Sequence, residues 1–383
     1  MKRTALTFSR IFVGVLFILS GLIKANDPLG FGYKLQEYFE VFHIPVLGDY
    51  ATAIAMLLCA MEIVLGALLL FGFWSKKVTV ALLGTIIFFT FLTFVSAAFK
   101  VVTSCGCFGD AIPLTPWQSF SKDLVLLLMI VYLFLHRDLI RPLYTSPGVQ
   151  TGVFSAVLAF SLLFSQYTYH ALPIVDFLPY KVGANIPELM KIPAGAKPDE
   201  FEIMYQLVNK KTGEKKTLSD KAYLKTGIWK DANWEIKGTP EKRLVKKGYD
   251  VKIKDLNITD ASGTAYTTEL IENPYYSIVI VAYDLGHTNE DAIAKLNAVA
   301  LNAAEQFNIR TVLLTSNSAQ DAEAFSKKMK LFAEVFYADA VPLKSMVRAN
   351  PGVLLLKNGV VVNKWHYSLM PTVDELSAKY FSK

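Results

Sequence analysis

Five apolar segments dominate the N-terminal half of the chain and limit what it can fold into. They cover residues 4–23, 50–72, 78–99, 117–135 and 151–169. Each is close to the ~20 residues that a helix needs to cross a bilayer. Val78 to Phe99 contains no charged residue, whereas Lys122 and Asp123 make the fourth segment the weakest of the five. We therefore expect a membrane α-helical bundle with five spans.

Lys and Arg are distributed unevenly among the segments that join these spans. The N-terminal tail, the second connection and the fourth connection are short and together carry six; the longer first and third connections carry four. Because basic residues concentrate in short cytoplasmic loops, we expect a cytoplasmic N-terminus, a multi-pass protein of the cell inner membrane and a periplasmic C-terminal domain. Lys2 and Arg3 precede the first span as in a signal peptide, but no small-x-small cleavage site follows, so we expect this span to be retained.

Residues 185–383 have the composition of a soluble domain, since 52 of the 72 charged residues follow residue 180. Residues 201–255 alternate polar and apolar side chains, which predicts short strands and hairpins. From Tyr276 the pattern changes to alternating strands and helices, and Asn358-Gly359 between two apolar runs predicts a tight hairpin. We expect an α/β domain with a β-rich N-terminal extension.

The stretch that begins at Arg348 places a proline before a strand and then a tight hairpin. Together with the order of the preceding strands and helices, it resembles the end of a thioredoxin-like fold. The resemblance implies a cis peptide bond at Pro351 and a redox Cys-x-x-Cys after the strand that ends at Tyr283. The chain has Asp284-Leu-Gly-His287 there, and no cysteine follows Cys107. Because thiol–disulfide exchange needs a thiolate, we expect no redox activity from this domain.

Two further motifs lie at the outer ends of the first and third spans. They are Ser20-Gly-Leu-Ile-Lys-Ala-Asn-Asp-Pro-Leu-Gly-Phe31 and Cys105-Gly-Cys-Phe-Gly109. Over about residues 5–140 they resemble the DoxX superfamily and, within it, the branch similar to methylamine utilisation protein MauE. The resemblance implies a four-helix core, and its fusion to a thioredoxin-like domain is of the Bacteroidetes type. We expect a bundle over 1–140, a fifth span and linker over 141–184, and the periplasmic domain over 185–383.

Cys105 and Cys107 are the residues to which we assign chemistry. Gly106 between them can adopt a positive φ, which lets the backbone turn tightly enough to bring the sulfurs together. A disulfide across so short a ring is strained and easily reduced, which favours a redox pair over a structural disulfide or two buried thiols. We expect no zinc site, because zinc takes four ligands and only Asp110 is near. Cys59, in the second span, is expected to be a packing residue.

Glu62 lies near the middle of the second span, where an acidic side chain costs about 2.5 kcal/mol or more to insert. It must be paired, protonated or turned into the bundle, and Arg10 is the partner that we expect. Glu62 serves either as a proton relay or quinone contact, or only as an interhelical hydrogen-bonding group. Lys24 and Asp27 by themselves indicate an interfacial anchor, whereas the resemblance implies that they shape a pocket near the cysteine loop.

Two functions agree with these features. In the first, the chain is a redox or maturation factor for periplasmic proteins that acts through the Cys-Gly-Cys loop. The DoxX and MauE resemblance implies maturation of periplasmic redox enzymes and sulfur- or quinone-linked chemistry, so a quinone is the cofactor that it suggests. In the second, the chain is a non-catalytic scaffold in the lipid bilayer whose thioredoxin-like domain binds a periplasmic or membrane protein. The dispersed net charge of +6 gives no sign of nucleic-acid binding.

Overall fold

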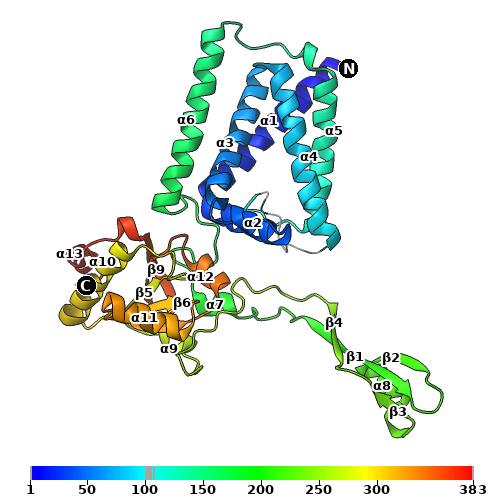
Figure 1. The fold of residues 1–383 in the computed structure, drawn as a ribbon, viewed down its shortest axis with the longest axis vertical. Coiled ribbons are helices and arrows are strands. Elements are labelled where there is room, and N and C mark those ends of the chain that lie inside the picture. Colours follow the sequence, from blue (N-terminus) through cyan, green and yellow to red (C-terminus); the bar gives the residue numbers. More distant parts are fainter. Residues whose placement is uncertain (1, 100–105, 107, 382–383) are drawn as a thin grey trace. The chain divides into compact units, whose positions relative to one another are not determined.

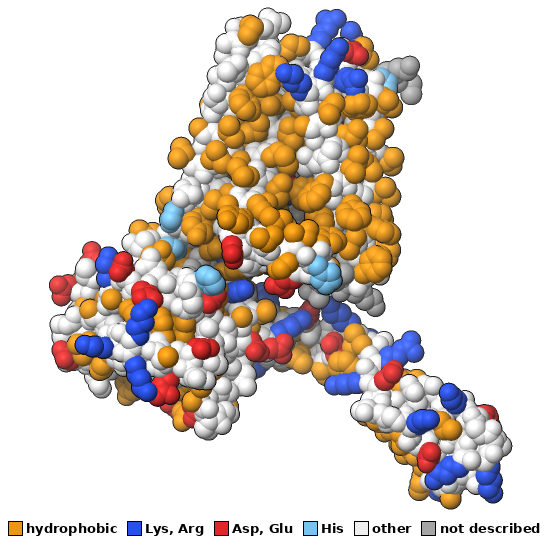
Figure 2. Space-filling view, in the orientation of Figure 1, with side chains coloured by type: hydrophobic (Ala, Val, Ile, Leu, Met, Phe, Trp, Pro, Cys, Tyr) orange, Lys and Arg blue, Asp and Glu red, His pale blue; other side chains and the backbone are white. Residues whose placement is uncertain are grey.

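The computed structural model describes residues 2–99, 106 and 108–381. Within these residues, five helices are long and apolar enough to cross a membrane (Figure 1). They are α1 (Lys2–Asn26), α3 (Ala51–Phe71), α4 (Ser75–Phe99), α5 (Pro116–Leu135) and α6 (Pro147–Ala171). Hydrophobic side chains cover the visible side of this bundle (Figure 2). The five predicted spans are confirmed, and the chain is a multi-pass membrane protein.

A shorter helix that the sequence analysis did not predict, α2 (Pro28–Val41), joins α1 to α3. Asp27 is the N-cap of α2, and its Oδ1 accepts a hydrogen bond from the backbone N–H of Gly30 at 2.9 Å. Pro28 occupies the first helical position, where its missing N–H costs nothing. Figure 1 shows α2 lying crosswise at the end of the bundle, where α1 ends.

Glycines allow α1 and α3 to approach each other closely. A Cβ at Gly66 on α3 would lie 2.6 Å from the backbone oxygen of Gly14 on α1, so no side chain fits there. Close approach of small residues is how membrane helices gain packing energy without a hydrophobic driving force between them. Val13, Leu82 and Ile130, from α1, α4 and α5, are completely buried in the same core.

The fifth span, α6, lies at the edge of this core. Only 11% of its most apolar stretch is buried, compared with 61% for α3. Its buried side chains are small and polar: Ser161, Ser165 and Thr168. The Thr168 hydroxyl donates to the backbone oxygen of Ala25 at 2.6 Å, which ties α6 to the end of α1.

The C-terminal part of the chain contains a five-stranded sheet in the order β7-β6-β5-β8-β9. Its strands are β5 (Tyr276–Val281), β6 (Arg310–Thr315), β7 (Glu334–Tyr337), β8 (Gly352–Lys357) and β9 (Val360–His366). β5, β6 and β7 pair in parallel, and β8 and β9 join antiparallel. The helices are α9 (Thr267–Ile271), α10 (Glu290–Phe307), α11 (Ala319–Met329), α12 (Ala340–Met346) and α13 (Val373–Leu376). The predicted α/β alternation is confirmed, and the thioredoxin-like assignment stays a prediction.

Two local features of this sheet agree with the sequence. Asn358 and Gly359 have φ values of +48° and +78°, as a two-residue hairpin between β8 and β9 requires. The bond between Asn350 and Pro351 is cis, as the thioredoxin resemblance implied.

Residues 184–256 form a compact unit by themselves, and residues 1–183 together with 257–383 form the other. The smaller unit contains α7 (Ile186–Met190), β1 (Glu200–Asn209), β2 (Lys215–Ser219), α8 (Asp220–Thr226), β3 (Trp234–Ile236) and β4 (Glu241–Lys246). β1 pairs antiparallel with β2, β3 and β4, so the predicted strands and hairpins are confirmed. The boundaries drawn at residues 140 and 184 stay predictions.

Short one-turn segments complete the described chain. They are η1 (Pro45–Leu47), η2 (Arg137–Leu139), η3 (Ile228–Lys230), η4 (Tyr367–Leu369) and the π-turn η5 (Ser377–Phe381).

A histidine pair lies where the end of β9 meets the end of α6. His366 is 5% exposed, and its ring centroid lies 6.3 Å from that of His170. Ser368 bonds to both residues, through Nδ1 of His366 at 2.7 Å and the backbone oxygen of His170 at 2.9 Å. Burial, together with the nearby His170, lowers the pKa of His366 from 6.5 to about 4, and burial is the larger cause.

This shift predicts a loss of stability in acid. Because the folded pKa lies below the unfolded value, the unfolded chain binds the proton more tightly, and stability falls as pH drops from 6.5 towards about 4. His366→Gln cannot titrate, so its unfolding temperature should fall less over this range than that of the wild type. The exposed His287→Gln is the control. It leaves His366 in place, and because Asp284 raises the pKa of His287, its loss should make the variant at least as acid-sensitive as the wild type. Equal slopes for wild type and His366→Gln would contradict the prediction.

Candidate functional site

The two cysteines to which the sequence assigns chemistry, Cys105 and Cys107, lie outside the described residues. Gly106 between them is described, and its φ of +51° confirms the expected left-handed backbone. A Cβ on this glycine would lie 3.4 Å from Cγ of Lys34 on α2. Gly106 is therefore held against α2.

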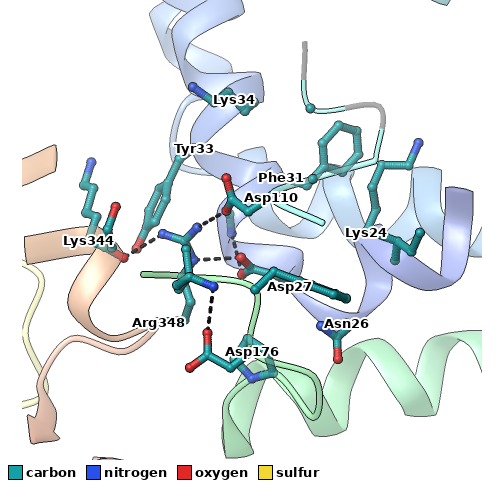
Figure 3. Close-up of a pocket in the computed structure, with 18 of the residues that line it drawn as sticks. Lys24, Asn26, Asp27, Phe31, Tyr33, Lys34, Asp110, Asp176, Lys344 and Arg348 are labelled. Carbon is teal, nitrogen blue, oxygen red and sulfur yellow. Dashed lines mark hydrogen bonds and ion pairs between the residues drawn. The ribbon is translucent and has the colours of Figure 1, made fainter. Parts of the chain in front are cut away.

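Gly106 lines a cavity of about 350 Å³. The walls come from the end of α1, from α2, from residues 173–178 after α6, and from α12 and the loop behind it (Figure 3). Charged side chains of both signs line it: Lys24, Asp27, Lys34, Glu37, Glu40, Asp110, Asp176, Lys344 and Arg348. Its size lies within the range of small-molecule sites. The fold thus brings the glycine between the two cysteines together with residues more than 200 positions away.

Arg348 is the most connected of these side chains (Figure 3). Its Nε donates to Oδ2 of Asp27 at 2.8 Å and its Nη2 to Oδ2 of Asp110 at 2.9 Å, while Nη1 donates to the backbone oxygen of Lys344 at 2.6 Å. The side chain is 7% exposed. Burial alone lowers the pKa of Arg348, but the two carboxylates outweigh that effect and raise it. Arg348 therefore stays charged and links the C-terminal sheet to α2 and to the segment just after Gly109.

Two tyrosines meet beside this ion pair. The hydroxyls of Tyr33 on α2 and Tyr283 at the end of β5 lie 2.8 Å apart. The Lys344 ammonium lies 4.6 Å from the centre of the Tyr33 ring and 5.5 Å from that of Tyr283. Burial raises the pKa of Tyr33 well above its usual value, so its hydroxyl stays protonated at neutral pH.

The loop after β5, where the resemblance implied Cys-x-x-Cys, is held by hydrogen bonds. Nδ2 of Asn350 donates to the backbone oxygen of Asp284 at 2.7 Å. Oδ2 of Asp284 lies 2.8 Å from Nδ1 of His287, and this contact raises the pKa of the exposed imidazole. No cysteine is present in this loop, and its contacts position backbone and side chains.

The expected partner of Glu62 was wrong. Glu62 forms an ion pair with Lys24, and both side chains are almost completely buried. Arg10 instead donates to the backbone oxygens of Leu69 and Leu70 at the other end of α3. Lys24 is available because its side chain turns into the bundle from the end of α1, where it also lies 5.0 Å from the centre of the Phe89 ring.

Lys24 and Asp27 both line the cavity beside Gly106, while Glu62 does not. Asp27 has two structural tasks there, because it caps α2 through Oδ1 and pairs with Arg348 through Oδ2. The functional roles assigned to Lys24, Asp27 and Glu62 stay predictions.

Sequence reasoning missed Arg348, Lys344 and Tyr33 as members of this site. For Arg348 a signal existed, because it lies three residues before Pro351, in the loop that the thioredoxin resemblance had already singled out. Tyr33 carried no signal, since α2 was not expected to be a helix.

Two further expectations concern Cys59 and metal binding. Cys59 is completely buried among apolar side chains of α1, α2 and α3, as a packing residue would be. In the described ranges, with residues 100–105 and 107 outside them, no three His, Cys, Asp or Glu side chains are grouped to hold a metal ion.

Comparison with known proteins supports the reading of the helical part. Residues 2–136 match the family of methylamine utilisation protein MauE. Protein TlpB of Flavobacterium psychrophilum is 29% identical over 130 residues, which are 33% of this chain and 35% of that protein. The chain thus spans about a third of the length of the curated relative that it matches. No solved structure matches the chain. Residues 2–136 are therefore similar to the MauE family, which supports a MauE-like membrane domain in this part of the chain.

The geometry predicts that Arg348 stabilises the docking of the C-terminal sheet onto α2. Arg348→Ala should lower the free energy of unfolding by about 3 kcal/mol, because it leaves Asp27 without its charged partner in a largely buried position. The change can be measured from thermal and denaturant unfolding of the full chain in detergent.

Arg310→Ala is the matched control for this measurement. Arg310 also binds two carboxylates, of Glu269 on α9 and Glu334 on β7, but both are about half-exposed. Its loss should cost about 1 kcal/mol or less. Equal losses for the two variants would show that the contact between Arg348 and α2 adds nothing.

Proposed function

We propose that the chain is a membrane redox or maturation factor that acts on other proteins through Cys105 and Cys107. The observation that carries the proposal is the position of Gly106, the residue between the two cysteines, in the wall of the 350 Å³ cavity. A pair of thiols needs an accessible site beside it where a second sulfur can approach. The cavity beside Gly106 supplies such a site.

The chemistry is thiol–disulfide exchange. A thiolate of the pair attacks one sulfur of a client disulfide, and a mixed disulfide forms as the other client sulfur leaves as a thiolate. The second cysteine then attacks the mixed disulfide, so that the client ends as two thiols and the pair as a disulfide. In the reverse direction the same steps oxidise a client dithiol to a disulfide and leave Cys105 and Cys107 as two thiols, and this is the direction that a quinone acceptor can sustain.

Renewed oxidation of the pair needs an electron acceptor. We assign this role to a quinone of the bilayer, which takes two electrons and two protons from the dithiol and becomes a quinol. Glu62 is the intramembrane group proposed to relay a proton or to contact the quinone. An acidic residue held inside a membrane bundle is costly and is by default a candidate for such a role.

The C-terminal sheet supplies no thiol. We propose that it belongs to a thioredoxin-like domain, and that this domain binds the cysteine-loop region and its client. We also propose that the N-terminus is cytoplasmic and the C-terminal domain periplasmic, in an inner membrane. The basic side chains at the end of the bundle that carries the N-terminus support this orientation (Figure 2).

A non-catalytic scaffold is the second candidate, and one observation favours it. Tyr283 and Asn350, beside the thiol-free loop after β5, are engaged within the chain by Tyr33 and Asp284. A domain whose thiol-free loop region is occupied in this way can serve as a fixed support to which a partner protein binds elsewhere.

Replacement of both cysteines distinguishes the two candidates. Thiol trapping of the wild type in graded redox buffers should show a reversible two-electron step, and Cys105→Ser/Cys107→Ser should lack it. In cells with this double variant, the ratio of thiol to disulfide in periplasmic client proteins should differ from that in wild-type cells. Cys59→Ala is the matched control. It should keep the reversible step and the wild-type thiol states of the clients, because Cys59 is buried in the bundle. A membrane-impermeant thiol reagent on intact cells should label Cys105 or Cys107 after reduction if the proposed orientation is correct.

The scaffold predicts a different result for the same variants. Client thiol states would be unchanged, and the partner proteins recovered with the double variant would be those recovered with the wild type. Wild-type protein without any reversible thiol step would overturn the redox proposal.

A further inference from the structure

A second, smaller cavity lies inside the helical bundle. It measures about 30 Å³, close to the volume that one water molecule occupies in the liquid. Its charged walls are Lys24 of α1, Glu62 of α3, and Lys122 and Asp123 of α5. Apart from these four groups and Ser20, the wall is apolar.

The four charged groups form two ion pairs. Glu62 pairs with Lys24 from another helix, and Asp123 pairs with its neighbour Lys122. Glu62 and Asp123 are only 3% and 1% exposed, so neither carboxylate has access to bulk water. Thr93 of α4 also donates to Oδ2 of Asp123 at 3.1 Å. Two positive and two negative charges thus face one small cavity, and their sum is zero.

One oxygen in this arrangement has no hydrogen-bond partner among the described residues. Oε2 of Glu62 is buried and accepts no hydrogen bond from any described residue, whereas Oε1 binds Lys24. A buried carboxylate oxygen without a donor is strongly unfavourable. A water molecule in the adjacent polar cavity would supply the missing donor, and waters at such sites typically make about three hydrogen bonds.

Lys24 connects this cavity to the larger one. Its side chain lines both the 30 Å³ cavity and the 350 Å³ cavity that Gly106 borders. The pair of Lys24 with Glu62 is therefore the polar boundary between the site beside the cysteine loop and the interior of the bundle.

We propose that a water bound to Oε2 of Glu62 joins the two ion pairs into one proton-transfer chain, with Asp123 as its second carboxylate. A proton that reaches Glu62 from Lys24 moves through the water to Asp123, and Lys24 regains its proton from the large cavity. Each transfer moves one proton and no electron. This inference deepens the proposed function, because oxidation of two thiols by a quinone requires a route for two protons.

The chain is tested first without any thiol chemistry. In the Cys105→Ser/Cys107→Ser background, the full protein in lipid nanodiscs is titrated while infrared difference spectra follow the carboxyl bands. Glu62→Gln and Asp123→Asn assign the bands. We expect Asp123→Asn to shift the pH at which the Glu62 band changes. In the same way, Glu62→Gln should shift the pH at which the Asp123 band changes. Two bands that respond independently, or no response to pH from either carboxyl, would overturn the proton chain whatever the cysteines do.

The second test removes the water and keeps the charges. Leu126 lines the small cavity, so Leu126→Phe fills it while leaving all four charged groups in place. The coupling between the two bands should disappear in this variant. Coupling that persists undiminished would show that the water plays no part.

Turnover of the cysteine pair is the third measurement. Glu62→Gln and Asp123→Asn should each slow it by about 10²-fold, the usual contribution of a positioned proton donor or acceptor. The double variant should be no slower than either single one, because the groups act in series. Asp138→Asn breaks an exposed ion pair with Lys76 and should leave the rate unchanged. Wild-type rates in folded Glu62→Gln and Asp123→Asn would refute the route, and absence of turnover in the wild type would refute only the proposed function.

Discussion

Hydrocarbon offers no hydrogen bonds, and this constraint governs the N-terminal half of the protein. Every polar group that enters the bundle must find its partner inside it. Lys24 and Glu62 satisfy each other between α1 and α3, and Arg10 satisfies backbone oxygens at the end of α3. The same constraint favours helices, whose backbone hydrogen bonds are satisfied within one segment, and close backbone contact, as at Gly14 and Gly66, contributes to their packing.

A different kind of interaction joins the bundle to the C-terminal sheet. Arg348 reaches from the loop before β8 to Asp27 and Asp110, and Lys364 of β9 pairs with Asp176 in the segment after α6. These arginine and lysine side chains are nearly buried, so losing one partner is costly even though the pairs themselves add modestly to stability. They give the thiol-free sheet a defined position beside α2, which is where Gly106 also lies.

The two cavities separate the tasks that the proposals assign. The larger one, beside Gly106, has mixed charge and room for a client segment or small molecule, whereas the smaller one has room for about one water. Lys24 belongs to both. A single buried lysine at the end of α1 therefore lines both the cavity beside Gly106 and the cavity inside the membrane domain.

Sequence alone determined the features that depend on neighbours along the chain. The length of the apolar segments predicted the five spans, the alternation of polar and apolar residues predicted the strands, and Asn358-Gly359 predicted the hairpin. Each of these signals is local, because it depends only on residues that are close in the sequence. Gly106 and the cis bond before Pro351 were also predicted, one from the freedom of glycine and one from a family resemblance. Asp27 was recognised, but the helix that it caps was not, because α2 is short and amphipathic and lies between two much stronger apolar signals.

Tertiary structure decided the pairings. Glu62 pairs with Lys24 and not with Arg10. Lys24 and Glu62 lie 38 residues apart in the sequence, and only the packing of α1 against α3 brings them together. Arg348 meets Asp27 across 321 positions, and no local pattern encodes a contact of that separation. Charged groups choose partners by distance in space, and that distance is fixed only when helices, sheet and connecting segments have packed.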